Sequence, residues 1–423
     1  MKLNVVFLGL IAFMALGSTS AVAQAPPAPS KLSEVLAKNL AANKGETSAE
    51  NRMRAFAKLL EAQRHIWRSN PARGRAAASA TPRQARAALQ TALELDPTLA
   101  EAYTTLAELS LRLPPTDIEE AIALAALAVK VDPNNFGGHR ILARLYTYKS
   151  NLNNGPLDQT MTGRAVEAWR EVVRLDPRNA EGWAFLAEFY SATSPNDQID
   201  ALKKWMASAT PLESDFYRRI MGPGSDLSPE RASLKLGKAL VRGGRSAEAV
   251  EVLSLLVADE PDNDQAIEHL REALSGTDAK TAGIAVEALR QAAFANQGNG
   301  ALVALLAQTQ ARAGKLDEAT TTLRDAVERA RISDVNSAAS LQVALGDLFA
   351  DADRLVEAAS AYESALRLRG LDKPRVVPEG ERNFAMAVFE KLINTYRRAN
   401  RQAEARAAIL RARQLLGEGV FSS

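Results

Sequence analysis

The chain of 423 residues has no cysteine and only three histidines. Without cysteine it forms no disulfide, no thiolate metal site, no cysteine nucleophile and no lipid attachment through an N-terminal cysteine. His65, His139 and His269 lie far apart and show neither Glu-x-x-His nor His-x-x-x-His spacing. That spacing would bring two ligands to one helix face, so no metal site is predicted.

Aromatic residues are also scarce, at 5% of the chain, although apolar residues make up 47%. Leu and Ala therefore supply the core, and both favour closely packed helices. No alternating strand pattern persists beyond a few residues. No Gly-rich phosphate loop follows a strand, and Gly-x-Ser-x-Gly does not occur. The sequence predicts no cofactor and no enzyme.

Long apolar runs are absent apart from one near the N-terminus. Residues 1–23 combine Lys2, an apolar stretch over 5–16 and an Ala-Val-Ala cleavage site before Gln24. This pattern is typical of a bacterial signal peptide and predicts an exported, periplasmic or secreted protein. An uncleaved N-terminal anchor is the alternative. No later run reaches membrane-spanning length, so no stable span is expected after cleavage.

A repeated pair of small residues is the strongest positive signal. A Gly or Ala is followed twelve residues later by an Ala, with a short polar turn between them. The pairs are Gly237 and Ala249, Ala307 and Ala319, and Gly346 and Ala358. A period near 34 residues with this spacing indicates a solenoid of helix pairs, in which small residues let the two helix axes approach.

The repeating residues resemble the tetratricopeptide repeat family, whose unit has small residues at positions 8 and 20 and Pro at position 32. The positions that carry the resemblance are Ala107, Ala121, Pro133, Pro177, Ala187, Gly237, Ala249, Pro261, Ala307, Ala319, Gly346, Ala358 and Ala405. The resemblance covers about 55–417 and implies an all-α, right-handed superhelical solenoid of antiparallel helix pairs, with about eight to nine units. At position 4 of its unit, His139 is expected to pack in the core.

Two insertions and one substitution interrupt the repeat. Residues 149–163 lengthen one turn, and residues 212–229 contain a Gly- and Pro-rich run that predicts a loop between two blocks. Arg271 occupies a small position and weakens its unit. The predicted organisation is a signal peptide at 1–23, then a linker and N-terminal helical segment at 24–53. A first block at 54–211, the inter-block loop at 212–229 and a second block at 230–423 follow.

Charge is unevenly distributed along the chain. Residues 31–86 carry twelve Lys and Arg against four acids, and residues 367–414 carry twelve against five. The stretch 87–366 has a net charge of −13. Basic ends could orient the protein on an anionic surface or contact the acidic middle of another copy, or they could be solvated caps. The basic residues are not interleaved with stacking aromatics, so nucleic-acid binding is not expected.

In the tetratricopeptide family the first helix of each unit lines a concave groove. Carried over, the groove positions are Glu101, Glu108, Arg140, Arg144, Glu181, Glu188, Arg231 and Lys238. Their sign alternates between units, which is compatible with two hypotheses: ion pairs that set the register of neighbouring units, or a polar groove for an extended peptide. The residues at position 9 depart from the family's carboxylate clamp, so binding of chaperone tails is disfavoured.

The function predicted from these features is a non-catalytic adaptor of the cell envelope that binds a partner protein or peptide in the groove. A self-associating structural subunit is the main alternative. A helical enzyme, or a domain that regulates one, is a third.

Overall fold

The computed structural model describes residues 31–43, 47–68, 81–112, 116–210, 214–373 and 375–421. The predicted signal peptide lies outside these residues, as does the linker up to residue 30. Helices dominate the described part of the chain, which contains no strand. The all-α prediction is confirmed.

The chain divides into two compact units, Met1–Ala232 and Ser233–Ser423, and the helix α11 (Pro229–Arg242) crosses the boundary. The first unit contains α1 (Lys31–Ala42), α2 (Ala49–Arg68), α3 (Thr81–Leu95), α4 (Ala100–Arg112), α5 (Ile118–Val131), α6 (Phe136–Lys149), α7 (Gln159–Leu175), α8 (Ala180–Tyr190), α9 (Pro195–Ser208) and α10 (Asp215–Met221). The second contains α12 (Ser246–Asp259), α13 (Asp264–Ser275), α14 (Ala279–Ala295), α15 (Gly300–Arg312), α16 (Leu316–Ser333), α17 (Val335–Asp351), α18 (Leu355–Leu368), α19 (Glu379–Arg398) and α20 (Gln402–Leu416).

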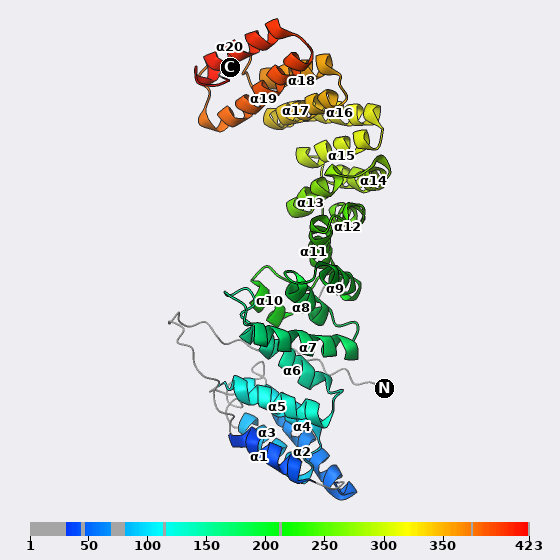
Figure 1. Cartoon of the computed structure of the whole chain (residues 1–423), viewed down its shortest axis with the longest axis vertical. Helices are drawn as coiled ribbons and strands as arrows, with labels where there is room; N and C mark the ends of the chain where they lie inside the picture. The colour runs from blue at the N-terminus through cyan, green and yellow to red at the C-terminus, as the bar shows by residue number, and fades with distance from the viewer. Residues whose placement is uncertain are drawn as a thin grey trace. The chain divides into compact units, whose positions relative to one another are not determined.

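Within each unit, helices that follow one another in sequence pack together as antiparallel pairs (Figure 1). In the first unit α2 pairs with α3, α4 with α5, α6 with α7 and α8 with α9. In the second, α15 pairs with α16, α17 with α18 and α19 with α20. The first helices of successive pairs are also in contact: α4 contacts α6, and α15 contacts α17. Each unit therefore has a face built from first helices.

Small residues lie where two paired helices cross. Ala249, Ala319 and Ala358 are fully buried. A Cβ added at Gly237 would overlap the Leu253 side chain, and one added at Gly346 would lie 2.7 Å from Cδ1 of the Tyr362 ring. The missing side chain of the glycine is therefore what admits a large residue of the partner helix.

Each Asp-Pro or Glu-Pro sequence ends a helix, because proline has no N–H to donate and displaces its predecessor from helical geometry. Thus α5 ends before Asp132-Pro133, and α7 ends before Asp176-Pro177. An Asn two residues after the Pro then begins the next helix: the side chain of Asn135 accepts from Gly138 N, and that of Asn179 from Gly182 N. These caps satisfy backbone donors that a helix start leaves unpaired.

In α4, α6 and α8 the large residue at position 4 ties the helix to the turn before it. Tyr103 Oη donates to Pro97 O at 3.0 Å, and Trp183 Nε1 donates to Pro177 O at 2.9 Å. His139 Nε2 lies 2.9 Å from Pro133 O, and since a carbonyl only accepts, this nitrogen carries the proton. His139 is 8% exposed. Its role is structural, as expected. It makes the same hydrogen bond to the preceding proline carbonyl that Tyr103 and Trp183 make.

The structure corrects two expectations about irregular segments. The insertion at 149–163 is shorter than predicted, because α6 continues to Lys149 and α7 already begins at Gln159. Residues 212–229 are not simply a loop, since they contain α10, whose Phe216, Tyr217 and Ile220 are buried. Tertiary contacts stabilise this seven-residue helix, which is too short to form alone.

Gly346→Ala is predicted to lower the free energy of unfolding by about 2 kcal/mol, because the added methyl overlaps the buried Tyr362 ring. The matched control is Gly283→Ala in α14, where an added Cβ meets nothing within 4 Å. There the change should raise stability by about 0.5–1 kcal/mol, since alanine favours the helix. Urea unfolding of both variants measures the difference. Equal effects of the two substitutions would contradict the close-crossing explanation.

Candidate binding surface on the first unit

The predicted groove residues of the first unit come from the same side of three first helices. Glu101 and Glu108 lie seven residues apart on α4, as do Glu181 and Glu188 on α8, and Arg140 and Arg144 lie four apart on α6. Both spacings place side chains on one helix face. We call this set the first-helix face. Its residues are Glu101, Glu108, Arg140, Arg144, Glu181 and Glu188.

A carboxylate held between two guanidinium groups is the centre of the first-helix face. Arg140 donates to Glu181 Oε2 through Nε at 3.1 Å and Nη2 at 2.8 Å. Arg144 donates to Glu181 Oε1 through Nε at 3.0 Å and Nη2 at 2.8 Å. The Glu181 side chain is 4% exposed, whereas those of Arg140 and Arg144 are 32% and 24% exposed. The ion pairs join α6 to α8 across the repeat boundary.

Burial and charge act in opposite directions on the acids of this cluster. Burial by itself would raise the pKa of Glu181, but the charges and hydrogen bonds of Arg144 and Arg140 hold that pKa below its usual range. Burial raises the pKa of Glu108, and the nearby charges of Arg112, Arg144 and Arg140 offset only part of that rise. Glu181 is therefore stabilised as a carboxylate, whereas ionised Glu108 is a cost to the folded state.

The short helix α10 is docked against the first-helix face. Ser214, its N-cap, donates to Glu181 Oε1 at 3.3 Å. The Arg144 guanidinium carbon lies 5.2 Å from the centroid of the Phe216 ring, within cation–π range. Tyr217 Oη donates to Glu188 Oε1 at 3.4 Å. The contacts thus combine a hydroxyl on a carboxylate with an aromatic ring on a guanidinium group.

An aromatic cluster lies beneath α10. The ring of Phe185 stacks on Trp169 with centroids 5.0 Å apart, and it meets Tyr217 edge-on at 5.2 Å. The ring of Trp205 also meets Tyr217 edge-on, with centroids 5.7 Å apart. Burial is the main cause that raises the pKa of Tyr217, so its hydroxyl stays a neutral donor. Such pairs add to the stability gained by burying the rings, which fixes α10 in place.

The two insertions of the repeat meet at α10. Asn153, in the turn between α6 and α7, has a left-handed backbone with φ of 69°. Its Nδ2 lies 3.0 Å from Met221 Sδ at the end of α10. Leu152 beside it is 8% exposed. The irregular segments therefore form one structure rather than two separate surface loops.

The remaining predicted groove residues do not join the cluster. Glu101 is exposed and carries no ion pair among the described residues. Arg231 lies close enough to Tyr217 for its charge to lower that residue's pKa, and its buried Nε has no hydrogen-bond partner in the described structure. Lys238 is exposed and belongs to the second unit.

Sequence reasoning missed the residues contributed by α10: Ser214, Phe216 and Tyr217. A signal was present, since a Ser precedes an acidic residue and three apolar residues lie at helical spacing over 216–220. The Gly-Pro-Gly run that follows, at 222–224, is the stronger signal and favours a loop.

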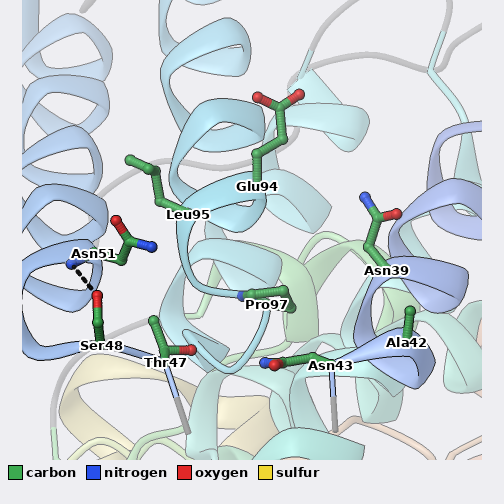
Figure 2. A pocket seen from close by; sticks show the side chains of 9 residues that line it. All are labelled: Asn39, Ala42, Asn43, Thr47, Ser48, Asn51, Glu94, Leu95 and Pro97. Atoms are coloured by element: carbon green, nitrogen blue, oxygen red, sulfur yellow. Dashed lines mark hydrogen bonds between the residues drawn. The ribbon is translucent and has the colours of Figure 1, made fainter. Parts of the chain in front are cut away.

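A separate recess of about 550 Å³ lies where α1, α2 and α3 approach (Figure 2). Its wall is mostly amide and hydroxyl groups, including Asn39, Asn43, Thr47, Ser48 and Asn51. Thr47 Oγ1 donates to Asp96 Oδ1 at 2.9 Å, so part of this polarity joins the start of α2 to the end of α3. The recess holds no pair of groups suited to acid–base or nucleophilic chemistry.

Metal-binding clusters and membrane-spanning helices are both absent from the described residues. These residues contain no group of three or more His, Asp or Glu side chains arranged to hold a metal ion. None of the described helices has the length and apolarity needed to cross a bilayer.

No protein-family model matches the chain, and no curated protein is similar to it. Among solved structures, PilW, a widely conserved type IV pilus biogenesis factor, is 18% identical over 56% of this chain and 93% of its own, with a TM-score of 0.27. PilF of Pseudomonas aeruginosa is 16% identical over 55% of this chain and 91% of its own, with a TM-score of 0.26. Scores this low describe no shared overall arrangement, so the fold assignment rests on the helices described above.

Glu181→Gln is predicted to lower the free energy of unfolding at pH 7 by about 3 kcal/mol, because it removes the carboxylate to which both partly buried arginines are bonded. Glu108→Gln is the matched control. It makes the same chemical change at a carboxyl whose raised pKa marks ionisation as unfavourable. The control should be as stable as the parent at pH 7 or slightly more so. Urea unfolding compares them.

The two acids should also differ in pH dependence. The lowered pKa of Glu181 means that its carboxylate stabilises the fold above the unfolded value, about 4.3, and that this contribution is lost as pH falls through the folded pKa. The raised pKa of Glu108 contributes stability below the unfolded value that is lost as pH rises. If Glu181→Gln leaves the acid limb of the stability profile unchanged, the ion cluster does not hold the fold as described.

Proposed function

We propose that this chain is an exported, non-catalytic scaffold of the cell envelope that binds a protein partner on the first-helix faces of its units. The observation that carries the proposal is the docking of α10. This short helix is held on the first-helix face by two hydrogen bonds, from Ser214 to Glu181 and from Tyr217 to Glu188. A cation–π contact between Arg144 and Phe216 adds to them. A partner segment with the same chemistry could use neighbouring positions.

The chemistry of the face supports a peptide of mixed character. Its guanidinium groups can form cation–π contacts with aromatic rings, and its carboxylates can accept hydrogen bonds from hydroxyl or amide groups. Glu101, together with the partly exposed Arg140, extends this surface beyond α10. In the second unit, Asp347 on α17 accepts from Lys391 on α19 at 2.6 Å, so charged pairs cross a repeat boundary there as well.

The pairing of Arg140, Arg144 and Glu181 also limits how the proposal can be tested. Reversing the charge of both arginines would break a structural ion cluster, and loss of a partner could then reflect unfolding. Exposed positions without an ion pair among the described residues, such as Glu101 and Lys238, avoid this difficulty.

Site-specific crosslinking in cells tests the proposal. A photoreactive phenylalanine analogue is placed at position 101 in the first unit or at position 238 in the second. We expect a distinct protein adduct, identified by mass spectrometry, from at least one of these positions. Control positions 251 and 329 are exposed on the second helices α12 and α16, away from the first-helix faces, and should yield no such adduct.

Two results would count against the proposal. Adducts from the control positions alone would place the partner on the second helices. An adduct that contains only this chain, at twice its mass, would support the self-associating structural subunit instead.

A further inference from the structure

Helix α2 has an exposed apolar stripe that the described structure leaves uncovered. Met53, Phe56 and Leu60 are 69%, 51% and 52% exposed. They lie at positions i, i+3 and i+7 of the helix, so they project from one side. Large side chains gathered on one side in this way mark an interaction surface.

The stripe is distinct from the face that α2 uses to fold. Ala55, Leu59 and Ala62 are buried, and α2 packs against α3. The exposed side chains are rotated away from these residues around the helix. Helix α2 belongs to the first helix pair of the described residues, and the terminal repeat of a solenoid normally presents a polar outer face. A second apolar face at this position therefore costs solubility unless something binds it.

Basic residues border the stripe. Helix α2 carries five Lys and Arg against two Glu. Arg64 and Arg68, both exposed, follow Leu60 at successive four-residue steps and so lie along the edge of the stripe. Residues 31–86 as a whole have a net charge of +8. The occupant of this surface is therefore expected to be anionic.

Charge disfavours the ends of a second copy of this chain as the occupant, and contact with the acidic stretch 87–366 of another copy is the outcome that an oligomer of the parent would reveal. The opposite end, residues 367–414, also has a net positive charge, +7. Pairing α2 with α2, or with the far end of another copy, would bring like charges together. The stripe is moreover a ridge on a single helix, which suits a flat interface better than a peptide that needs a groove.

We propose that α2 binds the surface of an anionic lipid bilayer, with Met53, Phe56 and Leu60 in the interfacial layer and Arg64 and Arg68 at the headgroups. A basic helix with bulky apolar side chains on one face is suited to lying in this layer. The surface would hold the first unit against a membrane without a transmembrane span. This is separate from the partner binding proposed for the first-helix faces.

Vesicle co-sedimentation of the full chain tests the proposal. We expect binding to vesicles that contain phosphatidylglycerol, much weaker binding to pure phosphatidylcholine, and a loss of binding as salt rises. Met53→Gln, Phe56→Gln and Leu60→Gln together should weaken binding at least tenfold, because the apolar contribution is removed while the helix is preserved. Arg64→Gln with Arg68→Gln should weaken it roughly tenfold on anionic vesicles only.

The control variants remove exposed apolar or arginine side chains from helices other than α2. Leu255→Gln, Phe294→Gln and Leu410→Gln remove three apolar side chains that are 66%, 78% and 60% exposed on other helices, and binding should not change. Arg329→Gln with Arg406→Gln controls for net charge. Circular dichroism and light scattering are recorded for every variant to confirm that it is folded and to give its mass.

Three results would overturn the proposal. The first is failure of the parent chain to bind anionic vesicles. The second is equal binding by the α2 triple variant. The third is an oligomer of the parent that the triple variant abolishes, which would make a second copy the occupant.

Discussion

The close approach of paired helices is the constraint on which the rest of this structure depends. It requires a residue with little or no side chain where paired helices cross closely, and at Gly346 the Tyr362 ring leaves no room for a Cβ. Tyr362 Oη then donates to Asp347 at 2.6 Å, and Asp347 also accepts from Lys391 on α19. A single small residue thus positions a buried ring, a hydroxyl and an ion pair between repeats.

The same logic explains where the repeat is weakest. At the unit of α13 and α14, Arg271 stands at the small position and its side chain is 41% exposed, paired with Glu268 on its own helix. The residue twelve positions later, Gly283, has open space beside it. The close crossing of the other pairs is not repeated there, and α14 packs on α12 and on α15.

Much of the fold could be predicted from the sequence, because helix pairs depend on local signals. The twelve-residue spacing of small residues and the Asp-Pro sequences that end helices can both be recognised within a single repeat. The position of α10 could not be predicted, since it depends on tertiary contacts to Phe185, Trp205 and Glu188, which the local signals at 214–220 do not specify. Likewise, spacing placed Arg140, Arg144 and Glu181 on one side of their helices, but the bonds between them depend on the distance between repeats.

The docking of α10 has a consequence for affinity. Any partner segment that needs Glu181, Arg144 or Glu188 competes with a segment of the same chain, whose local concentration is fixed by a short tether rather than by expression. A partner that displaces α10 can bind only the molecules in which α10 has left the first-helix face, so its apparent affinity is scaled down by that fraction. A partner that binds beside α10 meets a surface that is already ordered and loses less entropy on binding.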